Sequence, residues 1–327
     1  MIEIRACARL HLGLLDHSGA QGRLYGSIGL SVNQPHLLLR AEKADRLIVE
    51  GAETERVTEY ARRFIQRHGG PSGARLNLSS GIPAHVGLGS GTQIALAVGT
   101  ALARLSGLKI SAEEIALTAG RGVRSGIGIA TFQHGGFILD GGHPVRMDKA
   151  GVPPVLFRHS LPRDWYFVTA IPGKSQGFNG EREDRAFRHL PPVPSHLAEK
   201  ISWLVLMKML PALVEKNVSD FGRAMTEIQW MVGECFAPVQ GGRFSNPLSE
   251  KLIEFMFEHG VAGAGQSSWG PAVYGLVEGR EAARLLMKAV RAHPAGTEDS
   301  QVFCVRPQNR GAIIKESRQP APVSSEL

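Results

Sequence analysis

The sequence predicts an α+β protein with two domains, and three observations support this fold class. The chain has 327 residues, more than a single hydrophobic core usually organises. Segments with helical and with strand periodicity follow one another along its whole length. The proline-rich stretch "GVPPVLFRHSLPRD" near 151–164 separates two such series. We therefore expect an N-terminal domain over 1–158, a C-terminal domain over 159–307 and a mostly disordered tail over 308–327.

The N-terminal half begins with strands and continues with helices. "IEIRACARLHLGLLD", "GSIGLSV" and "HLLLRAE" are predicted as strands within the first 50 residues, and "ARLNLSS" as a later one. Helical periodicity marks 54–68 and the segment from Ile94 to Leu105, which Gly107 ends. A further helix begins at Ser111, where "SAEE" is a capping box, and runs to about Gly120. The next segment, "RGVRSGIGIATFQHGGFILDGG", is interpreted as glycine-rich chain that ends in a strand.

The C-terminal half alternates the two kinds of element, as an α+β sandwich would. Helices are predicted near 196–216, 218–232, 247–259 and 280–292, and strands at 165–171, 271–278 and 301–306. "GKSQGFNGEREDR" at 173–185 is predicted as a mobile loop. Its acids Glu181, Glu183 and Asp184 fit either a solvated surface or a Mg²⁺ contact, and the metal ligands stay unknown.

Composition narrows the class of protein. Hydrophobic residues are 43% and charged residues 20%, as in soluble globular proteins, and no apolar run reaches the ~20 residues that span a bilayer. The N-terminus lacks a secretory signal, so we expect a cytoplasmic protein. Cys7, Cys235 and Cys304 are far apart and are interpreted as thiols. The net charge of +7 with only 6% aromatic residues favours an anionic metabolite over nucleic acid.

A glycine-rich turn at 83–93, "PAHVGLGSGTQ", is the first candidate site. Free N–H groups at a helix start favour an anion, and glycines allow its close approach. The turn contains neither GK[ST] nor GxGxxG, so it is no Walker or dinucleotide loop. The alternative is a plain strand-to-helix turn in which Ser90 or Thr92 caps the helix.

This turn resembles the second motif of the GHMP kinase superfamily, Pro-x-x-x-Gly-Leu-Gly-Ser-Ser. Pro83, Gly87, Leu88, Gly89 and Ser90 match it. "ARLHLG" at 8–13 resembles the first motif, and "GVAGAGQSSWGPAVYGLV" at 260–277 lies where the third is expected. The resemblance implies a two-domain GHMP kinase fold, with an N-terminal half like ribosomal protein S5 domain 2 and a ferredoxin-like C-terminal half.

One position departs from the kinases. Where many of them read Ser-Gly-x-Asp, this chain has Ser125 and Gly126 but then Gly128 in place of the aspartate. Glycine cannot take a proton from an attacking hydroxyl, so a kinase reaction is disfavoured.

One branch is more similar, the β-ribofuranosylaminobenzene 5'-phosphate synthases. The resembling runs include "RLHLGLLDHSG", "GRLYGSIGLSV", "FAPVQGGRFS" and "GAGQSSWGP". The resemblance implies an enzyme that condenses 5-phosphoribosyl 1-pyrophosphate with 4-aminobenzoate or 4-hydroxybenzoate. Pyrophosphate and carbon dioxide leave, and a C-riboside 5'-phosphate forms for tetrahydromethanopterin biosynthesis. It also implies Mg²⁺ with the donor, no organic cofactor, no nucleic-acid or membrane partner, and is compatible with a homodimer.

Site residues follow from these runs. Asp16, Arg23 and His11 are assigned to catalysis, with Asp16 orienting the acceptor, stabilising charge at the sugar or helping to bind Mg²⁺. As alternatives, Asp16 caps the turn in "DHSG", Arg23 is a solvated arginine and His11 belongs to the core.

Phosphate or pyrophosphate binding is assigned to Arg9, Gly87, Gly89, Ser90, Gly91, Thr92, Arg124, Ser125 and Gly126. The benzoate pocket is assigned to Gln266, Ser267, Ser268 and Trp269, neutral donors beside a ring. A pocket without a tight arginine suits a carboxylate that must leave as carbon dioxide.

Two other functions remain open from the sequence. One is an ATP-dependent small-molecule kinase of the GHMP type that tolerates Gly128. The other is a non-catalytic protein that binds anions or RNA through its S5-like half.

Overall fold

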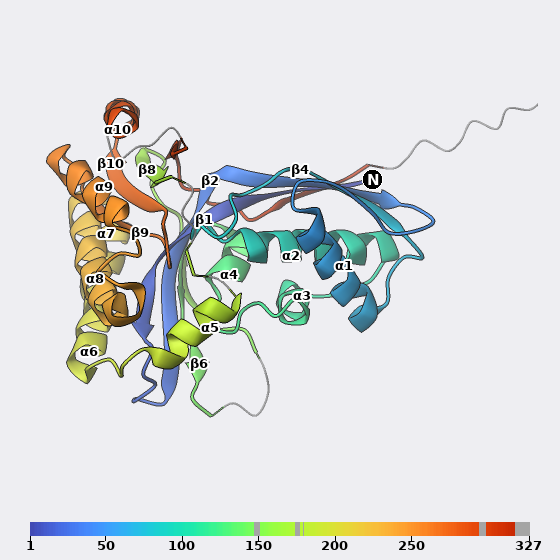
Figure 1. The fold of residues 1–327 in the computed structure, drawn as a ribbon, viewed down its shortest axis with the longest axis horizontal. Coiled ribbons are helices and arrows are strands. Elements are labelled where there is room, and N and C mark those ends of the chain that lie inside the picture. Colours follow the sequence, from blue (N-terminus) through green and yellow to red (C-terminus); the bar gives the residue numbers. More distant parts are fainter. Residues whose placement is uncertain (147–150, 174–176, 179, 294–298, 318–327) are drawn as a thin grey trace, which may run out of the picture.

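The computed structural model describes residues 1–146, 151–173, 177–178, 180–293 and 299–317. Within them lie two sheets, and the mixture of helices and strands confirms the α+β class. The larger sheet has the order β12-β1-β2-β4-β3, with β5 and β6 paired to β2 and β7 paired to β5. The smaller sheet has the order β11-β8-β10-β9. In Figure 1 the larger sheet and its helices α1–α4 lie on one side and the smaller sheet with α6–α10 on the other.

The strands of the larger sheet are β1 (Ile2–Asp16), β2 (Arg23–Lys43), β3 (Ile48–Gly51), β4 (Ala74–Ser80), β5 (Phe137–Asp140), β6 (His143–Pro144), β7 (Val155–His159) and β12 (Ile313–Glu316). Those of the smaller sheet are β8 (Trp165–Ile171), β9 (Gly263–Gln266), β10 (Val273–Glu278) and β11 (Gln301–Val305). The helices are α1 (Thr54–His68), α2 (Ser90–Ser106), α3 (Ala112–Thr118), α4 (Ile127–His134), α5 (Gly180–His189), α6 (Ser195–Leu204), the π-helical turn η1 (Val205–Met209), α7 (Leu210–Val214), α8 (Val218–Gln240), α9 (Pro247–Glu258) and α10 (Arg280–Ala292).

The long hairpin of β1 and β2 joins the two halves of the molecule (Figure 1). At its start, Ile2 and Ile4 pack into the core formed with α1 and α2. Further along, Leu10 and Leu12 pack into the core shared with α6, α7 and α8. The pairing shifts between Cys7 and Arg9, and Arg9 therefore lies where one core gives way to the other. The two segments predicted as separate strands before residue 43 form the single strand β2.

The helices predicted in the N-terminal half are confirmed. α1 buries Val57, Tyr60 and Phe64 on one face. α2 is buried on nearly all sides, and Gly107 ends it with a left-handed backbone. At α3, the Ser111 hydroxyl accepts a hydrogen bond from the Glu114 N–H at 3.1 Å, as the capping box predicts.

Two helices lie where the sequence predicted none. The glycine-rich segment after α3 contains α4, whose Gly128 is a poor helix former. Packing stabilises this helix, since its Ile127 lies against Gly29 of β2. The loop predicted at 173–185 is instead helix α5 from Gly180, which buries Ala186, while 174–176 and 179 lie outside the described residues.

The predicted disordered tail is wrong for 308–317. There β12 pairs antiparallel with β1, with Ile314 opposite Ile4. This strand could not be predicted from the sequence, because it is short and its partner strand is about 310 residues away. Residues 318–327 lie outside the described part of the chain.

The smaller sheet has a helical layer on each face. Trp165, Phe167 and Tyr274 pack toward α6, α7 and α8, and Val168 and Val273 pack toward α9 and α10. β9 ends at Gln266, so the chain leaves this sheet directly beside β1. No helix among the described residues is long and apolar enough to cross a membrane.

Candidate active site

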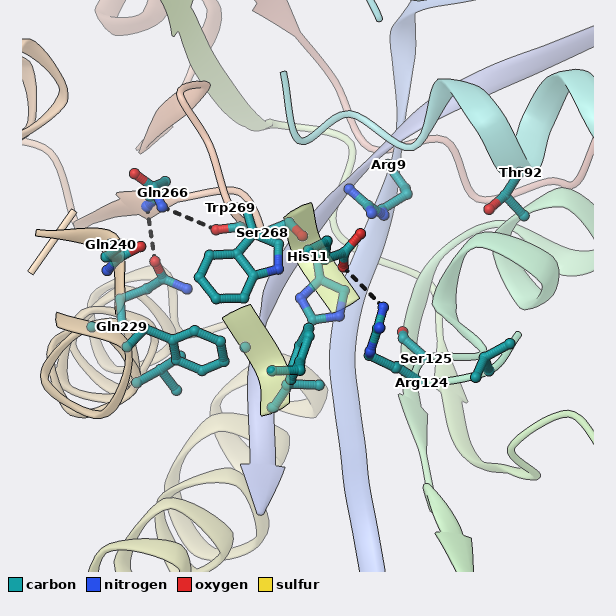
Figure 2. A pocket seen from close by; sticks show the side chains of 18 of the residues that line it. Arg9, His11, Thr92, Arg124, Ser125, Gln229, Gln240, Gln266, Ser268 and Trp269 are labelled. Atoms are coloured by element: carbon teal, nitrogen blue, oxygen red, sulfur yellow. Dashed lines mark hydrogen bonds and ion pairs between the residues drawn. The ribbon is translucent and has the colours of Figure 1, made fainter. Parts of the chain in front are cut away.

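A cavity of about 220 Å³ lies where the two halves meet. Its lining comes from β1, the segment 120–125, α5, α8 and the segment 266–269. Figure 2 shows Arg9, Thr92, Arg124 and Ser125 on one side, Gln229, Gln240, Gln266 and Trp269 on the other, and His11 between them. The cavity thus has two walls of different chemistry: a cationic wall formed by Arg9, Arg121 and Arg124, and a mostly neutral wall formed by Gln229, Gln240, Gln266, Ser268 and Trp269. Arg243 also lines the cavity, beside Gln240 of the mostly neutral wall.

Arg9 connects the cationic wall to the glycine-rich turn. Its guanidinium donates to the carbonyl of Gly87, and its own N–H donates to the carbonyl of Leu88 at 3.1 Å. Burial lowers the pKa of Arg9 to about 10, and nearby Glu183 opposes that shift. A pKa near 10 still leaves the guanidinium charged at neutral pH, so the cavity contains a desolvated cation.

The glycine-rich turn is packed against other segments at the positions expected to meet an anion. Gly87 has φ +86°, and a Cβ there would lie 2.0 Å from the carbonyl oxygen of Ser267. Gly89 has φ +81° and lies under the side chain of Arg9. Thr92 lines the cavity, whereas Gly87, Gly89, Ser90 and Gly91 do not. Their assignment to phosphate binding stays a prediction.

Cations nevertheless gather at the start of α2. The guanidinium groups of Arg56 and Arg121 each approach within 2.8 Å of where a Cβ of Gly91 would lie. Arg121 also donates to the Tyr60 hydroxyl and lies over that ring. Together with Arg9, these side chains add positive charge where the helix dipole already favours an anion.

His11 and Ser267 join β1 to the C-terminal segment. The Ser267 hydroxyl donates to the Gly87 carbonyl at 2.6 Å and accepts from the backbone N–H of His11 at 3.0 Å. The His11 side chain is 7% exposed. Burial, and then the charge of Arg9, lowers its pKa to about 3, so this imidazole is neutral at neutral pH. Ser267 is fully buried and does not line the cavity.

The neutral wall is a fixed hydrogen-bond network. Gln229 of α8 donates to the carbonyl of Leu12 and accepts from the N–H of Gln266. Gln266 in turn accepts from the Ser245 hydroxyl at 2.9 Å and donates to the Ser268 carbonyl at 3.0 Å. Because each amide has partners on both sides, its orientation is set before any ligand arrives.

An aromatic cluster adjoins this network. Trp269 is 6% exposed and stacks on Phe178 with ring centroids 5.0 Å apart. Phe187 and Phe236 meet it edge-on at 5.3 and 4.6 Å. Trp269, Phe187 and Phe236 all line the cavity, which gives it an apolar face suited to a flat ring.

Arg124 and Glu183 form an ion pair in the lining of the cavity. The Arg124 Nη1 lies 3.3 Å from a Glu183 carboxylate oxygen, and its Nη2 pairs with Asp184. The same guanidinium lies 4.3 Å from the centre of the Phe187 ring. Burial raises the pKa of Glu183, while Arg124, a hydrogen bond from Trp269 and Arg9 act in the opposite direction.

Ser125 and Gly126 position the start of α4. The Ser125 hydroxyl accepts from the Ile127 N–H at 3.2 Å and lines the cavity. The Gly126 N–H donates to Asp140 at 2.8 Å, and this buried carboxylate also accepts from the N–H groups of Ser27 and Gly142. Gly126 is therefore held by protein and does not line the cavity.

Gly128 packs against Thr92. A Cβ there would lie 3.0 Å from the Thr92 methyl carbon. Thr92 belongs to α2, so this helix packs closely against Gly128 of α4.

Asp16 and Arg23 lie outside the lining of the cavity. Asp16 accepts from both the N–H and the hydroxyl of Ser18 at 2.6 Å, which is a turn-capping arrangement. Arg23 donates to the carbonyls of Gly141 and Gly142 at 2.7 and 2.9 Å. Their catalytic roles stay predictions.

Of the other predicted residues, Arg9, His11, Thr92, Arg124, Ser125, Gln266, Ser268 and Trp269 come together around the cavity. The sequence analysis did not single out Gln229 or Arg243, which also line it, and gave Glu183 as one of three acids that fit either a solvated surface or a Mg²⁺ contact. Arg243 lies in the run "FAPVQGGRFS", so a signal existed for it. Gln229 has no such signal, because a glutamine in a helix is ordinarily a surface residue.

Comparison with known proteins gives the following relationships. Residues 55–136 match the model of the GHMP kinases N terminal domain, and residues 209–296 match that of the GHMP kinases C terminal domain. A β-ribofuranosylphenol 5'-phosphate synthase of Methanothermobacter thermautotrophicus is 37% identical over 294 residues, covering 84% of this chain and 88% of its own. One of Archaeoglobus fulgidus is 38% identical over 288 residues, covering 85% and 88%.

Among solved structures, homoserine kinase from Cytophaga hutchinsonii superposes with a TM-score of 0.68 at 19% identity, covering 96% of this chain and 97% of its own. L. major mevalonate kinase in complex with R-mevalonate gives 0.68 at 15% identity, covering 94% and 96%. At these identities the likeness concerns the fold, and it confirms the predicted two-domain architecture.

Proposed function

The chain belongs to the family of β-ribofuranosylphenol 5'-phosphate synthases within the GHMP kinase superfamily, and from this premise we propose that it is a decarboxylating phosphoribosyltransferase. The membership makes the chain an enzyme and removes the non-catalytic alternative. The proposed reaction joins C1 of 5-phosphoribosyl 1-pyrophosphate to the ring carbon of 4-hydroxybenzoate that carries the carboxylate. Pyrophosphate and carbon dioxide leave. We propose the hydroxy acid over the amino acid because the relatives are named for a phenol product.

The observation that supports this proposal most is the division of one cavity into a cationic and a neutral wall. A donor with a phosphate and a diphosphate needs several cations, and Arg9, Arg121 and Arg124 line one side. These guanidinium groups are partly desolvated, so they stabilise the charge that develops on departing pyrophosphate more strongly than cations in open water would.

The neutral wall suits the acceptor. Trp269, Phe187 and Phe236 offer a face for a benzoate ring. Gln229, Gln266 and Ser268 offer neutral groups. Such groups bind a carboxylate weakly. They therefore stabilise the ground state less than an ion pair would, and the barrier to decarboxylation stays lower. The nearby guanidinium of Arg243 lies within 4 Å of the carboxylates of Glu234 and Glu250, which offset its charge.

Kinase activity is disfavoured because Gly128 supplies no base at the position of the kinase aspartate. A Cβ there would lie 3.0 Å from the Thr92 methyl carbon, so Thr92 would have to move by a few tenths of an ångström to admit a side chain. The kinase reaction remains the alternative outcome of the experiment below.

Mg²⁺ is proposed to arrive with the donor. Among the described residues no group of three or more His, Cys, Asp or Glu side chains is arranged to hold a metal. Glu183, the one carboxylate among the described lining residues, already faces Arg124. This donor set does not fit a metal held by the protein alone, so we assign Mg²⁺ to the diphosphate oxygens of the donor.

The decisive experiment measures products. Purified protein is incubated with Mg²⁺, phosphoribosyl pyrophosphate and 4-hydroxybenzoate labelled in its carboxyl group. We expect pyrophosphate and labelled carbon dioxide in equal amounts, and neither when one substrate is omitted. Parallel incubations use 4-aminobenzoate, and ATP with small alcohols. Phosphorylation of an alcohol without release of carbon dioxide would replace this proposal with the kinase.

A further inference from the structure

Glu183 combines a catalytic functional group with a protected position. It lies on α5 and is the only carboxylate among the described residues that line the cavity. Its side chain is 29% exposed, against 51% for its neighbour Asp184, which is absent from the lining. It accepts a hydrogen bond from Trp269, so it lies at the edge of the aromatic cluster to which we assign the acceptor ring.

The proposed acceptor needs a proton removed. The ring carbon that attacks is para to the phenol oxygen, and it becomes strongly nucleophilic only when that oxygen carries a negative charge. A phenol with the ~10 pKa of tyrosine is ionised to roughly one part in a thousand at pH 7. A base within reach of the hydroxyl therefore increases the reactive fraction greatly.

We propose that Glu183 is this base: its carboxylate takes the phenol proton of the bound acceptor and gives it back to the product. The assignment rests on the proposed function. As the O–H bond breaks, the electron pair moves into the ring, and the para carbon forms a bond to C1 of the ribose while the C1–O bond to pyrophosphate breaks. The C–C bond to the carboxylate then breaks, and its electron pair restores the aromatic ring as a phenolate. The protonated Glu183 returns its proton, so no oxidant or further reactant is needed.

The other polar groups around the cavity fit this role less well. His11, with its pKa lowered to about 3, binds a proton weakly and is crowded by Arg9. The side chains of Gln229, Gln240 and Gln266 do not accept protons near neutral pH. Asp16 lies outside the lining and accepts two hydrogen bonds from Ser18.

The surroundings of Glu183 adjust its basicity. Burial raises its pKa and so brings the carboxyl group nearer to a phenol in proton affinity. Four neighbouring side chains also affect the pKa of Glu183: Arg124, Trp269 and Arg9 lower it, and Asp184 raises it. Arg124 at 3.3 Å also keeps the carboxylate in place, which a base needs as much as a suitable pKa.

The test uses Glu183→Gln with two acceptors. Glutamine keeps the size and the hydrogen-bond acceptor for Trp269 but cannot take the proton. With 4-hydroxybenzoate we expect kcat to fall ~100- to 10,000-fold, the range of general acid–base catalysis. With 3,5-difluoro-4-hydroxybenzoate, whose phenol is more acidic because fluorine withdraws electrons, we expect most of that loss to be recovered. The rate of the variant with the parent acceptor should rise about tenfold per pH unit until the phenol itself ionises, since hydroxide then supplies the ionisation.

Glu181→Gln is the matched control, because it removes the same charge from an exposed position on the same helix. It should keep the wild-type rate with both acceptors. Glu183→Asp, which keeps a carboxylate, should retain a larger share of the rate than Glu183→Gln and serves if the glutamine variant does not fold.

Equal losses with both acceptors, or a loss accompanied by a higher Mg²⁺ requirement, would overturn the assignment and indicate a positioning or metal-binding role. Wild-type kcat in a folded Glu183→Gln variant would do the same while leaving the proposed function intact. If the wild-type protein releases no carbon dioxide from either acceptor, the proposed function itself fails, and this inference fails with it.

Discussion

The two walls of the cavity differ in how they are built as well as in their charge. The cationic wall consists of long guanidinium side chains that come from β1 and the segment 120–125. Arg9 donates to the Gly87 carbonyl, Arg121 donates to the Tyr60 hydroxyl and Arg124 pairs with Glu183 and Asp184, but a guanidinium has five N–H donors and so keeps others for a ligand. The neutral wall consists of amides whose partners are already fixed, such as Gln266 between Ser245 and Ser268. Most of their hydrogen-bonding groups hold the wall itself in shape.

This difference explains how one cavity can treat two anionic substrates differently. The donor gains from strong charge that grows more favourable as pyrophosphate leaves. The acceptor carboxylate must lose its charge as carbon dioxide, so strong charge beside it would oppose the reaction.

Gly87→Ala should have the largest effect on stability, because Gly87 packs against Ser267 where the two halves of the molecule meet. The new Cβ would meet the Ser267 carbonyl oxygen at 2.0 Å, and a left-handed φ of +86° adds strain. Overpacking and left-handed strain together suggest a loss of ~2–5 kcal/mol in the free energy of unfolding. Gly22→Ala is the control, with the same φ of +86° and nothing within 4 Å. Urea unfolding that shows equal losses for both variants would mean that the contact with Ser267 contributes nothing.

Arg9→Met tests the cationic wall. Removing a buried charge-assisted contact should raise the apparent KM for phosphoribosyl pyrophosphate by roughly 10- to 150-fold, equivalent to ~1.5–3 kcal/mol. The KM for 4-hydroxybenzoate should change little. Arg40→Met, which removes an exposed arginine paired with Glu3, is the control and should leave both constants unchanged. Steady-state kinetics in which the acceptor KM rises instead would place the acceptor at Arg9.

The depressed pKa of His11 predicts acid sensitivity at the centre of the cavity. Its folded pKa of about 3 lies below the ordinary 6.5, so the unfolded chain binds more protons between these values. Stability is therefore lost as the pH falls below 6.5, by about 1.4 kcal/mol per pH unit from this group. Denaturant unfolding at pH 7.5 and 5.5 should show a smaller pH-dependent loss in His11→Gln than in the wild type. The same loss in both proteins would show that His11 does not titrate as described.

Gln240→Lys tests the neutral wall and should have the smallest effect. It introduces a cation beside the proposed benzoate site, since Gln240 lines the cavity at the end of α8. We expect the KM for 4-hydroxybenzoate to fall and kcat to fall as well, each by roughly 3- to 10-fold, because the carboxylate is held more tightly in the ground state than in the transition state. Gln66→Lys, on the exposed side of α1, is the control. A higher kcat in Gln240→Lys would contradict our account of why this wall is neutral.

Elements that depend on local chemistry could be predicted from the sequence. α2 follows from its apolar spacing and from Gly107, and α3 follows from the Ser111 capping box. The family motifs are local strings too, and they led to Arg9, His11, Thr92, Arg124 and the segment 266–269, all of which meet at the cavity or beside it. These features could be predicted because each depends on residues a few positions apart.

Which residues lie together and what each one contacts became clear only from the folded chain. β12 exists because β1 offers an open edge about 310 residues away, and α4 exists because β2 leaves room at Gly29 for Ile127. Glu183 became a candidate base only when α5 placed it opposite Arg124, and the glycines at 87 and 89 proved to be covered by Ser267 and Arg9. Burial, pairing and pKa shifts of this kind arise between segments far apart along the chain, and local pattern contains no information about them.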